Sequence, residues 1–146
     1  MLEVEFFGSK LLGGKTSLTT LSRLCEAAAN AAGITDGHVA IEFVDERRIA
    51  ELNGAHRGRR RPTDVLSFPI DGVDPLGGDG ADGIRARDGA SLPTRELGDV
   101  VICPAHASDL SEAVVHGMLH LLGMDHETDD GGMLSLQREL LRRQAQ

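Results

Sequence analysis

The sequence predicts an α/β (α+β) fold: one domain over residues 1–146, with a small four-stranded mixed sheet covered by helices. Short apolar segments with period-two alternation are interleaved with longer segments whose apolar residues recur every three or four positions. These are the patterns of strands and of amphipathic helices, respectively. The chain has 146 residues, of which 40% are hydrophobic and 26% charged, with no internal repeat. That size and composition are typical of one globular domain. The expected order of elements is β-α-β-α-β-β-α-α.

The first elements are a strand, a helix and a second strand. Residues 2–7 (LEVEFF) are short, apolar and partly alternating, which predicts a strand. We expect Thr16 to be the N-cap of the helix and Gly33 to end it. Residues 38–44 (HVAIEFV) alternate again and predict the second strand. The helix has apolar positions at spacings of three and four: Leu18, Leu21, Leu24, Cys25, Ala28 and Ala32.

A short helix and two further strands follow. Asp45 is the expected N-cap of a helix over 46–53, which Gly54 closes. Residues 64–69 (DVLSFP) predict the third strand, because the apolar run ends at a proline that cannot donate to a strand ladder. Residues 97–103 (LGDVVIC) predict the fourth strand.

The last two elements are predicted to be helices over about 105–123 and about 130–144. The second of these is amphipathic, with apolar positions at Met133, Leu136, Leu140 and Leu141. Before them, the segment 70–95 is rich in glycine and aspartate and poor in apolar residues. A loop of this length in a small domain is either functional or flexible, and we expect a flexible loop here.

The composition excludes several classes of protein. A net charge of −8 argues against a uniformly basic nucleic-acid binder, and an aromatic content of 3% argues against a wide platform for stacking bases. Two distant cysteines, Cys25 and Cys103, do not form a disulfide framework and fit a reducing compartment. No segment has the length and apolar content of a membrane span. We therefore expect a cytoplasmic monomer that does not bind membranes.

Three histidines form the strongest chemical signal, within VVHGMLHLLGMDHE (114–127). His116 and His120 are four residues apart in a helical pattern, so both rings project from one face. Gly123 breaks the helix, and the turn that follows brings His126 back toward that face. Three imidazoles with one open position are the layout of a catalytic zinc site. Asp125 is a candidate acceptor for an imidazole N–H, although a turn residue is an equally good interpretation.

The same string matches the metzincin protease pattern HExxHxxGxxH except at one position, where Gly117 replaces the glutamate. That glutamate is the general base in those proteases. A metallopeptidase or another metal hydrolase therefore stays an alternative, but one that lacks its usual base.

Four arginines lie within five residues: Arg57, Arg59, Arg60 and Arg61. Guanidinium groups bind phosphate oxygens through paired hydrogen bonds, so the cluster is a candidate anion site in an otherwise acidic chain. A solvated surface run of charges is the alternative interpretation.

The sequence resembles the YbeY family of bacterial metal-dependent endoribonucleases and rRNA maturation factors. The resemblance rests on LN…R-G…PTDVLSFP (52–69), LGDVVIC (97–103) and VVHGMLHLLGMDHE (114–127), in that order. It implies one zinc ion, or another divalent transition metal, held by His116, His120 and His126. It also implies a functional role for Arg57.

The expected function is that of a single-strand-type endoribonuclease that acts in maturation of the 16S rRNA 3′ end and in ribosome quality control. Catalysis would involve Arg57 and the three histidines, with Arg59, Arg60 and Arg61 contacting RNA phosphates. The expected partners are precursor rRNA and the ribosome or its proteins. A non-catalytic ribosome-assembly factor with a structural metal is a further alternative.

Overall fold

A four-stranded mixed sheet is at the centre of the protein in a computed structural model that describes residues 2–70, 95–124 and 131–144. The strands lie in the order β1-β2-β4-β3. β1, β2 and β4 are parallel, and β3 is antiparallel to β4. The predicted sheet is confirmed, and each strand begins and ends within one residue of its predicted bounds: β1 is Leu2–Phe7, β2 Gly37–Phe43, β3 Val65–Pro69 and β4 Glu96–Ile102.

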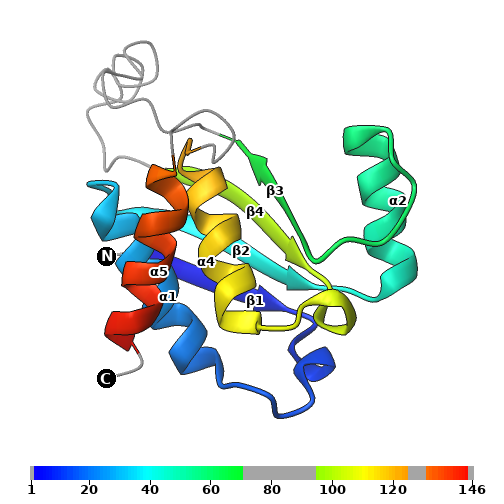
Figure 1. The fold of residues 1–146 in the computed structure, drawn as a ribbon, viewed down its shortest axis with the longest axis horizontal. Coiled ribbons are helices and arrows are strands. Elements are labelled where there is room, and N and C mark those ends of the chain that lie inside the picture. The colour runs from blue at the N-terminus through cyan, green and yellow to red at the C-terminus, as the bar shows by residue number, and fades with distance from the viewer. Residues whose placement is uncertain (1, 71–94, 125–130, 145–146) are drawn as a thin grey trace, which may run out of the picture.

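The helices lie on both faces of the sheet (Figure 1). They are α1 (Leu18–Ala31), α2 (Glu46–Arg57), α4 (Leu110–Leu121) and α5 (Gly132–Gln144), with 3₁₀ turns at Ser9–Leu12 and Pro104–His106. α1, α4 and α5 pack on one face, and α2 lies on the opposite side. The predicted order of strands and helices is therefore confirmed.

The start of α1 differs by one residue from the sequence-based prediction. Ser17, and not Thr16, is the N-cap, because its side-chain oxygen accepts a hydrogen bond of 3.1 Å from the backbone N–H of Thr20. Gly33 does end the helix. It has a φ of 81° and donates its N–H to the carbonyl of Asn30 at 2.9 Å.

Helix α2 is longer than predicted. Asp45 is its N-cap, as expected, and accepts a hydrogen bond of 2.8 Å from the N–H of Arg48. The helix does not close at Gly54 but continues to Arg57, and Gly58 closes it with a φ of 75°. Gly54 lies inside the helix because the chain that follows packs against it: a Cβ at that position would be 3.2 Å from the Cβ of Arg60.

The helix predicted over 105–123 is shorter, and it is α4. Asp109 begins it by accepting a hydrogen bond of 3.1 Å from the N–H of Glu112, which leaves the preceding residues in a 3₁₀ turn and a short connection. Helix α5 begins at Gly132, and the predicted start at residue 130 lies outside the described residues. So does most of the loop predicted over 70–95, of which the described residues include only the two ends.

The core has two parts, one on each face of the sheet. The larger part joins the sheet to α1, α4 and α5, and includes Cys25. The smaller part lies beneath α2, and includes Cys103. Both cysteines are free and buried. Burial raises the pKa of the Cys25 thiol to about 12, so this group is held as an unreactive thiol.

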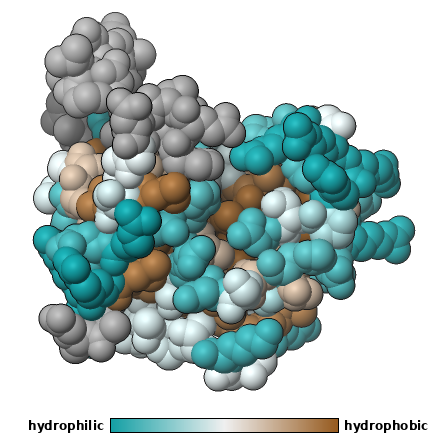
Figure 2. Space-filling model, viewed as in Figure 1, coloured by the Kyte–Doolittle hydropathy of each residue, from teal (hydrophilic) through white to brown (hydrophobic). Residues whose placement is uncertain are grey.

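The surface over α2 is strongly hydrophilic in Figure 2, where the side chains of this helix and of the loop after it are exposed. Among the described residues, no helix is both long enough and apolar enough to cross a membrane.

A histidine between two carboxylates ties three strands of the sheet together. The Nδ1 of His38 on β2 lies 2.8 Å from a carboxylate oxygen of Glu96 on β4, and its Nε2 lies 2.9 Å from Glu5 on β1. Hydrogen bonding to Glu96, and then to Glu5, raises the pKa of His38 above its ordinary value of 6.5 and outweighs the opposing effect of burial. Only the protonated ring can donate from both nitrogens.

We predict that His38 stabilises the protein more at pH 6 than at pH 9. Because its pKa is higher in the folded state, its contribution is fully present below the unfolded value near 6.5 and is lost as the pH rises through the folded value. His38→Gln should therefore lower the free energy of unfolding by roughly 0.2–1 kcal/mol at pH 6 and by less at pH 9. Urea denaturation at both pH values measures this, and an equal loss at both would contradict it.

Candidate active site

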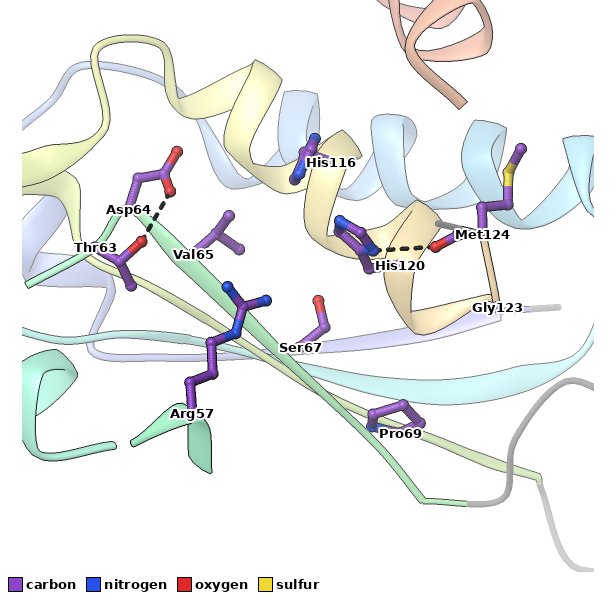
Figure 3. A pocket seen from close by; sticks show the side chains of 10 residues that line it. All are labelled: Arg57, Thr63, Asp64, Val65, Ser67, Pro69, His116, His120, Gly123 and Met124. Atoms are coloured by element: carbon purple, nitrogen blue, oxygen red, sulfur yellow. Dashed lines mark hydrogen bonds between the residues drawn. The ribbon is translucent and has the colours of Figure 1, made fainter. Parts of the chain in front are cut away.

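A cavity of about 470 Å³ lies where the end of α2, strand β3 and helix α4 meet. Figure 3 shows the side chains around it, with Arg57 on one side and the two histidines of α4 on the other. Its lining residues come from four segments of the chain: Arg57, Thr63, Asp64, Val65, Ser67, Pro69, His116, His120, Gly123 and Met124. The cavity thus brings together residues that the sequence analysis selected from two separate motifs.

His116 and His120 lie on one face of α4, as their spacing predicts. Their ring centroids are 4.7 Å apart, with an angle of 75° between the ring planes, and both residues are partly buried. The structure therefore places two of the three predicted metal ligands side by side at the cavity. The third, His126, and the candidate acceptor Asp125 lie outside the described residues.

Each of these two histidines has its Nδ1 held by an oxygen. The Nδ1 of His116 donates to Oε1 of Gln137 at 2.8 Å, and the Nδ1 of His120 donates to the carbonyl of Met124 at 3.0 Å. Amide and carbonyl oxygens only accept hydrogen bonds, so the proton of each neutral ring is on Nδ1 and the lone pair is on Nε2. This is the arrangement that metal-ligating histidines have in proteins. The two residues fit the predicted zinc ion.

The turn after α4 orients His120. Gly123 has a φ of 97° and donates to the carbonyl of His120 at 3.0 Å, while the N–H of Met124 donates to the carbonyl of Leu119 at 3.0 Å. Together these two bonds form a Schellman motif, which only a residue with positive φ completes without strain. The turn that ends the helix also places the Met124 carbonyl within reach of the His120 ring.

Gly117 faces the sheet and not the cavity. A Cβ at this position would lie 2.5 Å from Cγ1 of Val100 and 2.8 Å from Cγ2 of Val65, so the helix can approach the strands this closely only at a glycine. The hydroxyl of Ser67 donates to the Gly117 carbonyl at 2.7 Å and fixes the same contact from β3. A glutamate at position 117, as in the metzincin pattern, would not fit.

Arg57 is the last residue of α2 and shares the cavity with the histidines. Its side chain is exposed, and it forms no ion pair with any described residue. The structure separates the other three arginines. Arg59 and Arg61 line a second cavity that adjoins the first, and Arg60 lines neither.

Three residues near the histidines were not selected from the sequence. Gln137 is buried on α5, four residues after Met133 and three before Leu140. A polar residue within an apolar helical stripe was the signal that could have identified it. Asp64 and Ser67 line the cavity from β3 and its approach, where the sequence pattern showed only a strand.

The fold and the cavity define a class of protein: a small α/β protein that presents imidazole nitrogens and a guanidinium group to one cavity. The comparisons with known proteins agree. A family model described as Endoribonuclease YbeY matches residues 12–145. The chain belongs to this family.

Individual relatives support the assignment. The chain is 34% identical to Endoribonuclease YbeY of Bacillus cytotoxicus over 155 aligned residues, which cover 96% of this chain and 94% of that protein. It is 39% identical to the Moorella thermoacetica protein of the same name over 127 residues, covering 81% and 79% respectively. The solution structure of TM1509 from Thermotoga maritima is similar with a TM-score of 0.52 and 26% identity, covering 97% of this chain and 88% of that one.

We predict that Gly117→Ala lowers the free energy of unfolding by about 1–3 kcal/mol, because the new methyl group overpacks the interface between α4 and the sheet. This loss should exceed the gain of about 1 kcal/mol that alanine brings inside a helix. Gly54→Ala is the matched control, since its methyl would come no closer than 3.2 Å to Arg60, whereas a methyl at position 117 would lie 2.5 Å from Val100. Urea denaturation compares them, and a Gly117→Ala protein as stable as the wild type would show that the close approach is not needed.

We also predict that, with zinc bound by His116 as the sequence predicts, Gln137→Leu lowers zinc affinity by about 10–100-fold, the usual effect of removing a hydrogen-bond acceptor from a ligating histidine. Gln137→Glu should keep the affinity near the wild-type value, because a carboxylate also accepts from the His116 Nδ1. Competition with a chromophoric chelator measures both without any assay of activity. Equal affinities in the leucine variant and the wild type would mean that Gln137 does not orient the ring.

Proposed function

We propose that this protein is a single-strand-type endoribonuclease in which His116, His120 and His126 hold one zinc ion, or another divalent transition metal. We further propose that it acts in the maturation of the 16S rRNA 3′ end and in ribosome quality control. The rRNA step rests on the resemblance of the motifs to the YbeY family.

One observation carries the proposal: Nδ1-anchored histidines and an arginine with no ion pair among the described residues face one cavity, in a chain of the Endoribonuclease YbeY family. Histidines with the lone pair on Nε2 suit a metal ion. A guanidinium that no carboxylate neutralises suits a phosphate. A phosphodiester bound across the cavity would contact both groups.

Different residues of the chain would have different roles in cleavage. When bound, a zinc ion supplies Lewis-acid chemistry, since it polarises a phosphoryl oxygen and makes a water molecule acidic enough to attack at neutral pH. Arg57 stabilises the negative charge that develops on the phosphate. Gln137 and the Met124 carbonyl keep the two imidazoles oriented, so little reorganisation is needed when substrate binds.

The described residues offer one carboxylate at the cavity, that of Asp64. It is exposed, and it accepts a weak hydrogen bond of 3.4 Å from the Thr63 hydroxyl. Among the described residues, the metallopeptidase alternative could take its general base only from such a residue, since position 117 faces the sheet. No observation favours it over cleavage of a phosphodiester.

The proposed partners are single-stranded precursor rRNA and the ribosome or its proteins, met in the cytoplasm by a monomeric enzyme. Binding to bare RNA should be weak and sensitive to salt, because the net charge of −8 repels nucleic acid except at the arginines.

The test compares cleavage of a labelled single-stranded RNA and of casein by the wild type, His120→Ala and Arg57→Ala, with and without a chelator. We expect RNA cleavage that the chelator and His120→Ala abolish. Arg57→Ala should lower kcat by about 10²–10³, as loss of one group that stabilises transition-state charge does. Metal analysis of the purified wild type should find one equivalent per chain.

Matched controls separate these effects from general damage. His106→Ala removes an exposed histidine whose Nε2 lies 2.6 Å from a Glu46 oxygen, and Arg47→Ala removes an exposed arginine of α2 that lines neither cavity. Both variants should cleave RNA like the wild type.

RNA cleavage that survives loss of the metal would contradict the proposal. Casein cleavage that His120→Ala abolishes would favour a peptidase. Cleavage of neither substrate, with a chelator lowering the thermal stability, would favour a structural metal.

A further inference from the structure

A second cavity, of about 600 Å³, adjoins the first. Its lining residues are Asn53, Arg57, Arg59, Arg61, Pro62 and Thr63. Arg57 and Thr63 line both cavities, so a ligand in one could continue into the other. Its volume is that of an ordinary ligand site. The proposed cleavage site involves only the first cavity.

The walls of the second cavity are held in place and are not a loose surface loop. The chain after α2 turns back alongside the helix before it enters β3 (Figure 1). The Nδ2 of Asn53 on α2 donates to the carbonyl of Arg61 at 2.9 Å, and the N–H of Arg61 donates to the carbonyl of Arg59 at 2.8 Å. Gly54 lets Arg60 pack directly on the helix. These contacts fix the backbone that carries Arg59 and Arg61.

The arginines of this cavity carry charge that the described part of the chain does not neutralise. Arg57, Arg59 and Arg61 are all exposed and form no ion pair there. Other arginines of this acidic protein do have carboxylate partners: Arg142 and Arg143 pair with Glu139. Three unpaired cations around one cavity favour an anion there, and phosphate matches guanidinium geometry best.

Asn53 gives an independent indication of a ligand. The residue is 5% exposed, and its Oδ1 is buried without a hydrogen-bond partner among the described residues. Leaving such an acceptor unsatisfied costs about 1–3 kcal/mol, so a buried acceptor normally has a donor. Phosphate oxygens only accept hydrogen bonds at neutral pH. A ligand that satisfies Oδ1 therefore needs a hydrogen-bond donor besides its phosphate, such as a hydroxyl.

We propose that the second cavity binds the ribose-phosphate unit next to the cleaved phosphodiester of a single-stranded RNA. Its phosphate lies against the guanidinium groups of Arg59 and Arg61, and its ribose 2′-OH donates to Oδ1 of Asn53. The 2′-OH is the group that distinguishes RNA from DNA at a given site. Asn53 is then a specificity residue as well as the residue that positions the arginine loop. The inference rests on the proposed function, because it places the neighbouring cavity on the same RNA strand.

The first experiment measures binding of a fluorescent single-stranded RNA by anisotropy at several salt concentrations, read before cleavage proceeds. Arg59→Ala and Arg61→Ala should each weaken binding and reduce the slope of log K against log salt by about 0.7, the value for one phosphate contact on a single strand. Arg47→Ala removes the same charge from an exposed position of α2 that lines neither cavity, and should leave the slope unchanged. In steady-state cleavage, Arg59→Ala and Arg61→Ala should raise KM and leave kcat near the wild-type value.

The second experiment needs no mutation for its main result. A series of RNAs carries a single 2′-deoxy substitution at each position, and the wild type should bind one of them about 2–10-fold more weakly, as expected for the loss of one hydrogen bond. That position should be next to the cleaved bond. Asn53→Ala should bind the substituted and unsubstituted RNAs equally.

These outcomes separate the inference from the proposed function. Equal salt slopes for the Arg47, Arg59 and Arg61 variants would overturn the phosphate site. A wild type that is insensitive to every single 2′-deoxy substitution, or that binds DNA of the same sequence equally well, would overturn the role of Asn53. If the wild type cleaves no RNA but the slopes and the 2′-OH effect appear as expected, the binding subsite stands and the proposed cleavage fails.

Discussion

The close approach of α4 to the sheet at Gly117 is the constraint on which the rest of the site depends. Because Gly117 has only a hydrogen where other residues have a Cβ, the helix can lie directly against Val100 and Val65. At this distance the Ser67 hydroxyl reaches the backbone carbonyl of the helix. His116 is adjacent in sequence and therefore projects at a fixed angle from this contact. The histidine positions are thus set by the packing of the core, which is close-packed and resists displacement.

The sequence predicted strands and helix order well because periodicity is a local property. It failed where a tertiary contact outweighed a local signal. Gly54 has the sequence signature of a helix end, yet Arg60 packs against it and the helix continues. The spacing of His116 and His120 predicted that they share a face, which the structure shows. The orientation of the His116 ring could not be predicted from the sequence, because its hydrogen-bond acceptor, Gln137, lies on another helix. His126 stays a prediction.

The net charge of the chain did not indicate the positive charge at the cavity, because carboxylates named below form ion pairs in other parts of the protein. Glu5 and Glu96 surround His38 on the sheet, and Glu139 pairs with arginines on α5. The arginines after α2 keep their charge within a small volume. Electrostatic attraction acts over about 10 Å at ordinary salt, so a ligand at this cavity responds to the local cations more than to the sum over the chain.

The hydrogen bond between His116 and Gln137 also sets an order of assembly. The ring lies on α4, and the acceptor that fixes its tautomer lies on α5, 21 positions further along the chain. During synthesis the histidine pair emerges first, and a chain that stops before α5 has an imidazole with no such partner. Orientation of the His116 imidazole is therefore linked to docking of α5, and agents that loosen this helix should disturb the histidines before they melt the sheet.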